Sequence, residues 1–414
     1  MLTRFSTVLG VSLALTTALP QSNDAALLER ARSLLKQTPL IDGHNDYPWA
    51  LREKAQRNIE KLDIAKPQPS IMTDITRLRA GGVGGQFWSV YVPVDVTGSP
   101  VTATLEEIDT VHQMVRRYPE TFELALTADD VERVFKKGKI ASLIGMEGGH
   151  SIDNSLAALR MFYRLGARYM TLTHSKNTAW ADSATDDPKF GGLAPFGEEV
   201  VREMNWLGML VDLSHVSPET MEDAIRVTQA PVIFSHSSSR ALNDVPRNVP
   251  DNILQLLPKN GGVVMVTFVP GFLSPKVAAW TKLQDAERAR LTKQFPADTA
   301  AVTRGVDGWT AAHPAPRATL AEAADHIDHI RKVAGIDHIG LGSDFDGITM
   351  VPEGLEDVSK YPALVAELLR RGYQDDDVKK IVGQNVLRVM REVEKASKRL
   401  QSERGPSTVV FDAK

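Results

Sequence analysis

Residues 209–236 of the chain read MLVDLSHVSPETMEDAIRVTQAPVIFSH. Two short apolar runs, Met209–Leu213 and Pro231–Ser235, flank a longer amphipathic segment, and a histidine, His215 or His236, follows the end of each run. Continuous runs of Val, Ile, Leu and Met are typical of strands that are buried on both faces of a parallel sheet. This stretch therefore predicts a strand–helix–strand unit that places its two histidines at the same edge of the sheet.

The same alternation of short apolar runs and longer amphipathic segments extends over most of the chain. The eight apolar runs are Leu40–Gly43, Gly85–Val92, Ile140–Met146, Tyr169–Thr173, Met209–Leu213, Pro231–Ser235, Gly262–Phe268 and Ile339–Ser343. Helical patterns lie between them, for example at Leu156–Leu165, Gly197–Leu207 and Ala321–Ala334. Eight such units without a break in composition predict an α/β fold in which the strands close into a (β/α)8 TIM-type barrel.

The composition excludes several classes of protein. The chain has 414 residues, 43% of them hydrophobic, which is enough to bury a large core. With 48 basic and 52 acidic residues, the charge balance predicts no nucleic-acid partner. The absence of cysteine excludes disulfides, thiolate metal sites and thiol nucleophiles. No glycine-rich phosphate-binding motif follows a strand, which argues against a nucleotide enzyme. Any bound metal must therefore be held by histidine and carboxylate.

The two ends of the chain differ from the centre. Arg4 precedes an uncharged apolar run, Phe5–Leu19, and a polar segment follows Pro20. This pattern predicts a signal peptide over residues 1–20 and an exported, periplasmic or secreted protein without a stable membrane anchor. The apolar run is shorter than the ~20 residues of a spanning helix. Residues 21–400 are predicted to form a single catalytic barrel domain, and residues 401–414 a polar tail.

One connection is much longer than the others. Residues at about 270–318, after the seventh apolar run, form an insertion rich in Ala, Lys, Pro and Thr. Connections of this length are usually functional lids or disordered segments. Because the insertion leaves the carboxyl end of a strand, we predict a partial lid over the mouth of the barrel, with a helix at Gln284–Gln294.

Six of the eight apolar runs end in a histidine or a carboxylate. In barrel order the side chains are His44 and Asp46, Glu147, His174, His215, His236, and Asp344 with Asp346. The carboxyl ends of barrel strands converge on one mouth, which is where catalytic groups of this fold lie. A single histidine or aspartate at a strand end is more often a cap or a loop hydrogen bond, and we assign Asp42 and Ser214 to that class. Grouped at one mouth, the others predict a metal site.

The donor set indicates which metal this site holds. Three imidazoles (His44, His215, His236) and two carboxylates (Asp46, Glu147) suit zinc, and two ions fit them better than one. Glu147 is the natural bridging ligand. Two ions ~3.5–4 Å apart share a water and lower its pKa to ~7, which supplies hydroxide for attack on a carbonyl. The H-x-x-H pair His326 and His329 has the spacing of a metal site, but its amphipathic surroundings favour a surface position or helix packing.

Longer motifs identify a family that the chain resembles. The strings are IDGHNDYPW, GGQFWSVY, SLIGMEGGHSID, TLTHSKNTAWAD, PVIFSHSSSRA, RNVPDN, GSDFDG and VPEGLEDVSKYP. They are similar to those of the membrane (renal) dipeptidase family, and the similarity runs from about Leu40 to Arg391. The resemblance implies a zinc hydrolase with a barrel of the metallo-dependent hydrolase type that cleaves the peptide bond of free dipeptides.

The resemblance also implies roles for individual residues. His44 and Asp46 are expected to bind one zinc ion and His215 and His236 the other, with Glu147 as the bridge. His174 would contact the substrate near the scissile carbonyl, Arg247 would bind the substrate carboxylate, and Asp344 would lie near the substrate amine and the leaving group. Glu147, His174 and Asp344 would thus act in catalysis. The family further implies tolerance of a D-residue at the carboxyl-terminal position, weak hydrolysis of some β-lactams, and a homodimer.

Two departures from the family pattern and two rival functions accompany this interpretation. Tyr47 stands beside a ligand where many relatives have leucine, which predicts an altered pocket wall. The long insertion predicts altered side-chain specificity. One rival is an amidohydrolase acting on cyclic amides or N-acyl amino acids, but His174 occupies the place of its usual bridging lysine. The other rival is a non-catalytic exported binding protein, against which the five intact ligands argue.

Overall fold

The computed structural model describes residues 21–412. The strands are β1 (Leu40–Asn45), β2 (Val83–Ser89), β3 (Phe122–Leu124), β4 (Ile140–Met146), β5 (Ala167–Thr171), β6 (Leu210–Asp212), β7 (Ile233–Ser237), β8 (Val263–Val266) and β9 (Ile339–Leu341). The predicted signal peptide, residues 1–20, lies outside the described residues. Within these residues, no helix combines the length and the apolar character that crossing a bilayer requires.

Eight of the strands close into a parallel barrel, as predicted. β1 pairs with β2, β2 with β4, and the ring continues through β5, β6, β7 and β8 to β9, which pairs back with β1. The ninth strand, β3, was not predicted. It pairs with the first half of β4, from Phe122 opposite Ile140 to Leu124 opposite Ser142, whereas β5 pairs with the second half. β3 thus widens the sheet at one place without interrupting the ring.

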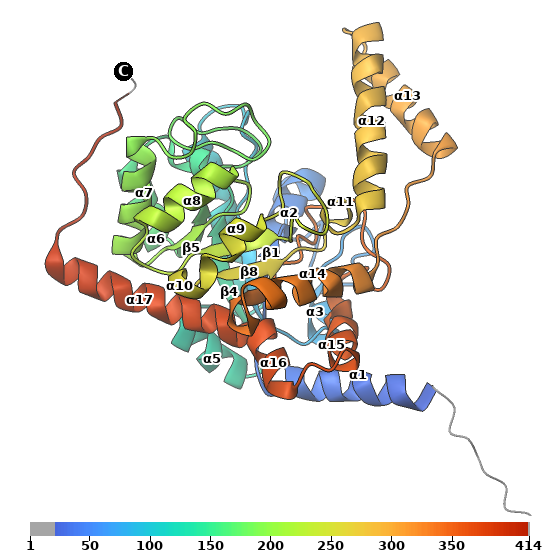
Figure 1. Ribbon diagram of the computed structural model, residues 1–414, viewed down its shortest axis with the longest axis horizontal. Coiled ribbons are helices and arrows are strands. Elements are labelled where there is room, and N and C mark those ends of the chain that lie inside the picture. The colour runs from blue at the N-terminus through green and yellow to red at the C-terminus, as the bar shows by residue number, and fades with distance from the viewer. Residues whose placement is uncertain (1–20, 413–414) are drawn as a thin grey trace, which may run out of the picture.

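Helices surround the barrel (Figure 1). They are α1 (Gln21–Leu35), α2 (Tyr47–Ala55), α3 (Ile75–Ala80), α4 (Pro100–Arg117), α5 (Ala128–Lys136), α6 (Leu156–Arg164), α7 (Pro195–Leu207), α8 (Pro218–Val227), α9 (Asp251–Leu254), α10 (Leu257–Asn260), α11 (Pro270–Leu273), α12 (Pro275–Gln294), α13 (Thr299–Ala312), α14 (Leu320–Val333), α15 (Tyr361–Arg370), α16 (Asp375–Lys379) and α17 (Asn385–Glu403). Short 3-10 turns lie at Gly149–Ile152, Ile336–His338 and Val358–Lys360, and a π-helical turn lies at Lys380–Gln384.

The stretch that predicted the fold forms β6, α8 and β7. Its helix begins where the sequence indicates, because the Ser217 hydroxyl accepts a hydrogen bond from the backbone N–H of Thr220 and Pro218 occupies the first turn. β6 and β7 pair in parallel through Asp212 and Ile233. The carboxyl ends of both strands, and the histidines that follow them, therefore face the same mouth of the barrel.

The barrel interior is filled with large apolar side chains. One buried cluster includes Ile41, Phe87, Tyr169 and Met265, which come from four different strands. The rings of Phe87 and Tyr169 lie 5.1 Å apart between centroids. Residues of α5 and α17 belong to the same cluster. The interior is therefore a solid core, which leaves the carboxyl-terminal mouth as the place for polar chemistry.

The insertion after β8 folds into a pair of helices, α12 and α13, joined by a short turn. In Figure 1 this pair, drawn in orange, extends away from the barrel. It has a small apolar contact of its own, made by Leu291, Val302 and Val306. The predicted helix at Gln284–Gln294 is the second half of α12, and α13 was not predicted.

The function of this helical pair as a lid stays a prediction, and deletion of residues 281–311 tests it. Because the pair has its own contact, we expect the shortened protein to unfold at nearly the same temperature as the full chain while its preference among dipeptide side chains changes. Thermal unfolding and assays on a dipeptide panel measure the two effects. Unchanged preference would rule out the lid.

The carboxyl end also differs in detail from the prediction. The tail was placed at 401–414, but α17 continues to Glu403. Beyond it the chain runs along α6 and α7, where Phe411 packs edge-on against Phe196 at 5.1 Å between ring centroids and Ser407 donates its backbone N–H to Glu203. This segment is polar in composition but is bound to the surface of the domain.

Candidate metal centre and substrate pocket

The carboxyl ends of seven barrel strands deliver polar side chains to one mouth. They are His44 in β1 with Asp46 after it, Ser89 in β2, Glu147 after β4, His174 after β5, His215 after β6, His236 in β7 and Asp344 after β9. Ser89 was missed by the sequence analysis, although it also ends a strand, because a serine hydroxyl is not specific to a metal site. The other residues are those that the sequence pattern singled out.

Glu147 lies at the centre of this group. Its Oε1 is 2.9 Å from Nε2 of His215 and 3.4 Å from Nε2 of His236. Its Oε2 is 3.4 Å from Nε2 of His44 and accepts a hydrogen bond from the Ser89 hydroxyl at 3.2 Å. The two carboxylate oxygens thus face two different sets of histidines, which is the arrangement that a bridging ligand requires.

The His44 side of the group is rich in carboxylates. Nε2 of His44 lies 3.4 Å from Oδ2 of Asp46 and 4.0 Å from Oδ1 of Asp344. Three overlapping sets of ligand atoms lie close enough together to hold a cation: His44 with Glu147 and His236, Glu147 with His174 and His215, and His44 with Asp46 and Asp344. The eight predicted site residues include every member of these sets.

The buried atoms of this group fit a metal ion. Within the described residues, Nε2 of His44 and Oδ1 of Asp46 are buried and have no hydrogen-bond partner. Burial opposes a proton on His44, but the interactions with Tyr169, Glu147 and Asp46 together outweigh it and raise the pKa of His44 well above its usual value. Burial and the same two carboxylates raise the pKa of Asp344. A buried site with so negative a potential is stabilised by a cation.

The other two histidines are prepared to act as ligands. Burial lowers the pKa of His215 and of His236 well below the usual value, so both imidazoles are neutral, as metal binding requires. Nδ1 of His236 is 2.9 Å from the Ser235 hydroxyl, which in turn donates to Oδ2 of Asp212 at 2.6 Å. This chain of hydrogen bonds places the lone pair of His236 on Nε2, which faces Glu147 and lies 2.9 Å from Nε2 of His215.

His174 lies at the open side of the group. Its Nε2 is 3.6 Å from Oε1 of Glu147, and its side chain is 18% exposed. The ring contacts Tyr91 at 4.8 Å between centroids, and Tyr91 contacts Trp49 at 5.0 Å. The main-chain carbonyl of His174 accepts a hydrogen bond from the Ser183 hydroxyl at 2.6 Å. These partly exposed rings form an aromatic wall beside the centre.

Arg247 occupies the same mouth and is unusual in its surroundings. It is 6% exposed, and within the described residues its guanidinium makes no ion pair and its Nη1 has no hydrogen-bond partner. The group lies over the ring of Phe272 at 5.3 Å. Its charge lowers the pKa of His215, after burial itself, which places it beside the histidines. A buried cation without a partner is costly unless a ligand anion pairs with it.

Several residues near the mouth have structural functions. Tyr47 is fully buried and donates its hydroxyl to the carbonyl of Leu62 at 2.9 Å, so the prediction that it alters the pocket wall is wrong. Asp346 accepts a hydrogen bond from the backbone of Met72, and burial raises its pKa to about 6. His326 is buried between Ser239 and Leu273, as expected for helix packing.

Asp42 and Ser214 make structural hydrogen bonds, as expected of the class to which we assigned them. Asp42 is fully buried in β1 and accepts hydrogen bonds from the backbone and hydroxyl of Ser343 and from the hydroxyl of Tyr361. The Ser214 hydroxyl accepts a hydrogen bond from the backbone N–H of His236 at 3.0 Å. Asp42 joins β1 to the segment that follows β9, and Ser214, in the turn after β6, joins that turn to β7.

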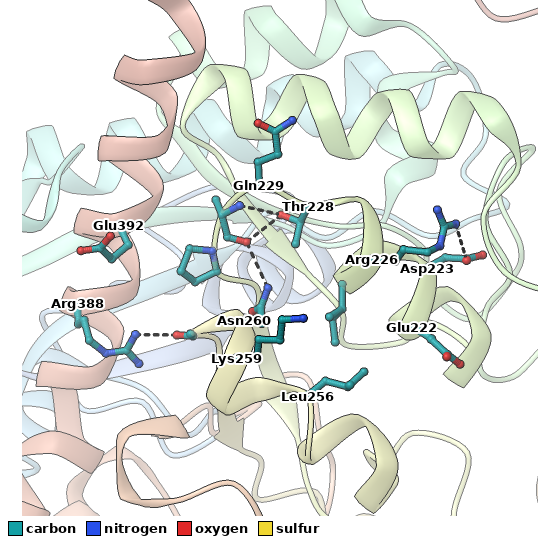
Figure 2. Close-up of a pocket in the computed structure, with 14 residues that line it drawn as sticks. Glu222, Asp223, Arg226, Thr228, Gln229, Leu256, Lys259, Asn260, Arg388 and Glu392 are labelled. Atoms are coloured by element: carbon teal, nitrogen blue, oxygen red, sulfur yellow. Dashed lines mark hydrogen bonds and ion pairs between the residues drawn. The ribbon is translucent and has the colours of Figure 1, made fainter.

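A separate hollow lies at the opposite end of the barrel (Figure 2). It is lined by residues that precede β7 and β8, such as Gln229 and Lys259, and by Arg388 of α17. Its two arginines have partners: Arg388 donates to the carbonyl of Gly261, and Arg226 pairs with Asp223. The amino ends of barrel strands are associated with stability rather than catalysis. We therefore place the functional site at the other end.

Gly347 is a further position on which the centre depends. A Cβ atom there would lie 2.3 Å from Oδ2 of Asp46 and 2.7 Å from Oδ1 of Asp344. We expect Gly347→Ala to displace both carboxylates and to weaken metal binding about 10- to 100-fold, the range seen when the support of a ligand is lost. Metal affinity and thermal unfolding are the measurements.

Gly308→Ala provides the control, because a Cβ at that exposed helical position meets nothing within 4 Å. It should leave metal affinity unchanged and stabilise α13 slightly. Equal metal affinity in the two variants would show that the carboxylates tolerate the displacement.

Together, a closed (β/α)8 barrel and a mouth rich in histidine and carboxylate define the class of metal-dependent barrel hydrolases. Comparison with known proteins gives the family. The chain belongs to the membrane dipeptidase family (peptidase family M19), whose sequence profile matches residues 28–404. It is a metallo-dipeptidase of that family.

Individual relatives agree with this assignment. The chain is 42% identical over 386 residues to dipeptidase verJ of Clonostachys rogersoniana, covering 90% of this chain and 89% of that protein. Among solved structures, it is similar to the probable dipeptidase PvdM from Pseudomonas aeruginosa, with a TM-score of 0.79, 28% identity, and coverage of 91% of this chain and 100% of that chain.

A third relative shares the fold. It is a metallo peptidase from Rhodobacter sphaeroides, solved with a phosphinate mimic of the dipeptide L-Ala-D-Ala. The TM-score is 0.70 at 24% identity, and the match covers 86% of this chain and 99% of that chain.

Proposed function

We propose that the protein hydrolyses free dipeptides with two zinc ions held by His44, Asp46, Glu147, His215 and His236. The observation that carries this proposal is the position of Arg247, a buried guanidinium without an ion-pair partner among the described residues, in the mouth that also holds the ligand cluster. A substrate that brings its own carboxylate to this mouth satisfies the buried charge. A free dipeptide does so within one residue of its peptide bond.

Different residues of this chain would bind the two ends of the substrate. Arg247 is planar and permanently charged, and it can bind the substrate carboxylate through two parallel hydrogen bonds. Asp344 faces the His44 side of the cluster, where it can receive the substrate amine or pass a proton to the leaving nitrogen. Recognition of both ends of the substrate would confine the site to dipeptides.

His174 is the candidate for stabilising the oxyanion. It is exposed enough to reach a substrate, lies 3.6 Å from Glu147, and has a pKa that burial lowers. A single hydrogen-bond donor to an oxyanion contributes roughly 3–4 kcal/mol to catalysis. The neighbouring ring of Tyr91 limits the directions that the imidazole can take.

The zinc ions, when bound, supply a Lewis acid for the scissile carbonyl and lower the pKa of a coordinated water toward ~7. His44 and Asp46 would hold one ion, His215 and His236 the other, and Glu147 both. No thiol or serine nucleophile is needed for such a reaction, which agrees with the absence of cysteine.

An assay on paired substrates tests the proposed reaction against the amidohydrolase rival. The zinc-loaded protein should hydrolyse a free dipeptide and leave an N-acetyl amino acid intact, because the latter lacks the free amine. Preference for the N-acetyl amino acid would overturn the proposal. Comparison of L-Ala-D-Ala with L-Ala-L-Ala in the same assay tests the proposed tolerance of a D-residue, and a β-lactam tests the proposed weak lactamase activity.

Export and homodimerisation complete the proposal. The apolar run at residues 5–19 supports export to the periplasm or the medium, with cleavage near Pro20. Amino-terminal sequencing of protein recovered outside the cytoplasm tests it, and a mature chain that starts at Met1 contradicts it.

Light scattering of the purified protein tests the homodimer that the family resemblance implies.

A further inference from the structure

Tyr169 lies beneath the metal centre in the barrel interior and contacts one of the proposed ligands. It is in β5 and is fully buried. Its hydroxyl oxygen is 2.8 Å from Nδ1 of His44, and the hydroxyl donates a hydrogen bond to the carbonyl of Gly43 at 3.2 Å. The sequence pattern does not distinguish this residue, because a tyrosine inside an apolar strand is usually a core residue.

The proton of this hydroxyl determines which nitrogen of His44 is free. A phenol has one hydrogen, and the Gly43 carbonyl lies within its reach at 3.2 Å. With the hydrogen donated there, the oxygen accepts the hydrogen on Nδ1 of His44 at 2.8 Å. When a metal ion displaces the second proton of the ring, the imidazole presents its lone pair on Nε2. That atom faces Asp46 and Glu147 at 3.4 Å from each and has no hydrogen bond of its own among the described residues.

The neighbouring strand leaves room for the ring of Tyr169. A Cβ on Gly145 in β4 would lie 2.0 Å from Cζ and 2.4 Å from the hydroxyl oxygen of Tyr169. On another side the ring contacts Phe87 at 5.1 Å between centroids. Any larger residue at position 145 would displace the ring, and with it the hydroxyl. The phenol is therefore held in one position below His44.

The other half of the centre has the same arrangement. The Ser235 hydroxyl lies 2.9 Å from Nδ1 of His236 and donates to Oδ2 of Asp212. In both cases a hydroxyl accepts a hydrogen bond from the imidazole and donates one to a buried oxygen atom. Ligating histidines commonly depend on such partners for orientation and basicity.

We infer that Tyr169 is a positioning residue for the metal centre, which fixes His44 with Nε2 directed at the ion. This inference rests on the metal centre proposed above. It assigns to Tyr169 an effect on metal affinity in addition to its contribution to the core.

Substitution of Tyr169 by phenylalanine tests the inference. The ring remains and only the hydroxyl is lost, so we expect the affinity for one of the two zinc ions to fall about 10- to 100-fold while the other ion binds as before. Competition with a chromogenic zinc chelator, starting from metal-free protein, measures both affinities without any assay of activity. Thermal unfolding measures the stability of each variant.

Tyr47→Phe is the matched control. Tyr47 is also fully buried and donates its hydroxyl to a backbone carbonyl, that of Leu62 at 2.9 Å. Although Tyr47 follows Asp46 in the chain, its hydroxyl makes no hydrogen bond to a proposed ligand among the described residues. Its loss should reduce stability by a similar amount and leave both zinc affinities unchanged. A merely structural function of Tyr169 predicts the same result for both variants.

The outcomes separate this inference from the proposed function. If the unsubstituted protein binds no zinc, the metal centre and the inference both fail. If it binds two ions and Tyr169→Phe binds them with equal affinity, the inference alone fails. Should the phenylalanine variant not fold, Tyr169→Met removes the same hydroxyl. Nitrogen-15 NMR of the zinc-loaded unsubstituted protein is an independent test, because coordination of His44 through Nδ1 would overturn the inference.

Discussion

Replacement of Arg247 by methionine is expected to reduce kcat/KM for a free dipeptide about 10²- to 10³-fold, or ~3–4 kcal/mol. This lies in the lower part of the ~3–5 kcal/mol lost when a buried ion pair loses one partner. The same variant should unfold at an equal or higher temperature than the unsubstituted protein. The reason is that Arg247 is a buried cation without an ion-pair partner in the described part of the chain. Its removal therefore eliminates the cost of burying that charge in the substrate-free protein.

A substrate with a blocked carboxylate completes this test. The unsubstituted protein should discriminate against a dipeptide amide by a factor similar to that lost in Arg247→Met, and the variant should no longer discriminate. Arg240→Met is the matched control, because Arg240 lies in the same loop but donates to the carbonyls of Asn248 and Pro246. If Arg247→Met still preferred the free dipeptide, the assignment of Arg247 to the substrate carboxylate would be refuted.

Replacement of Glu147 by glutamine is expected to have the larger effect. Its two oxygens face different histidines, at 2.9 Å from His215 and 3.4 Å from His44, and an amide cannot bridge two cations. We expect the variant to lose at least one zinc ion and to hydrolyse dipeptides at least about 10³-fold more slowly, since both charge stabilisation and water activation depend on the ions. Metal analysis and steady-state kinetics measure these losses.

Glu107→Gln controls for the removal of a buried carboxylate. Glu107 is fully buried in α4 and pairs with Arg52 at 2.9 Å, away from the barrel mouth. Its substitution should alter stability but neither the zinc content nor the rate. Near-full activity of Glu147→Gln, with a normal zinc content, would remove Glu147 from the centre.

Most of the fold could be predicted because the barrel strands are buried on both faces. The run at Ile140–Met146 is one example, since its residues are apolar or small throughout and coincide with β4. β3 was missed because its sequence, FEL, is too short to form a pattern and it pairs with only half of β4. α13 was missed because Gly305 and Gly308 interrupt its helical pattern.

The site could be predicted to the extent that its residues are rare at strand ends. Histidines such as His236 are distinctive there, whereas the supporting hydroxyls of Ser89 and Tyr169 are common in ordinary cores. A sequence pattern does not show which way a side chain of a helix points, and for this reason Tyr47 was predicted to line the pocket. It lies in the first turn of α2, and its hydroxyl reaches inward to Leu62 instead.

Titration of the metal-free protein with zinc, while hydrolysis of a free dipeptide is followed, tests the central claim most directly. The claim is that the cluster around Glu147 holds two ions and that dipeptide hydrolysis depends on them. The predicted result is a metal-free protein without activity, whose rate rises as zinc is added and reaches its limit at two ions per chain. Full dipeptidase activity in the metal-free protein, or zinc bound in that ratio without any hydrolysis, would contradict the claim.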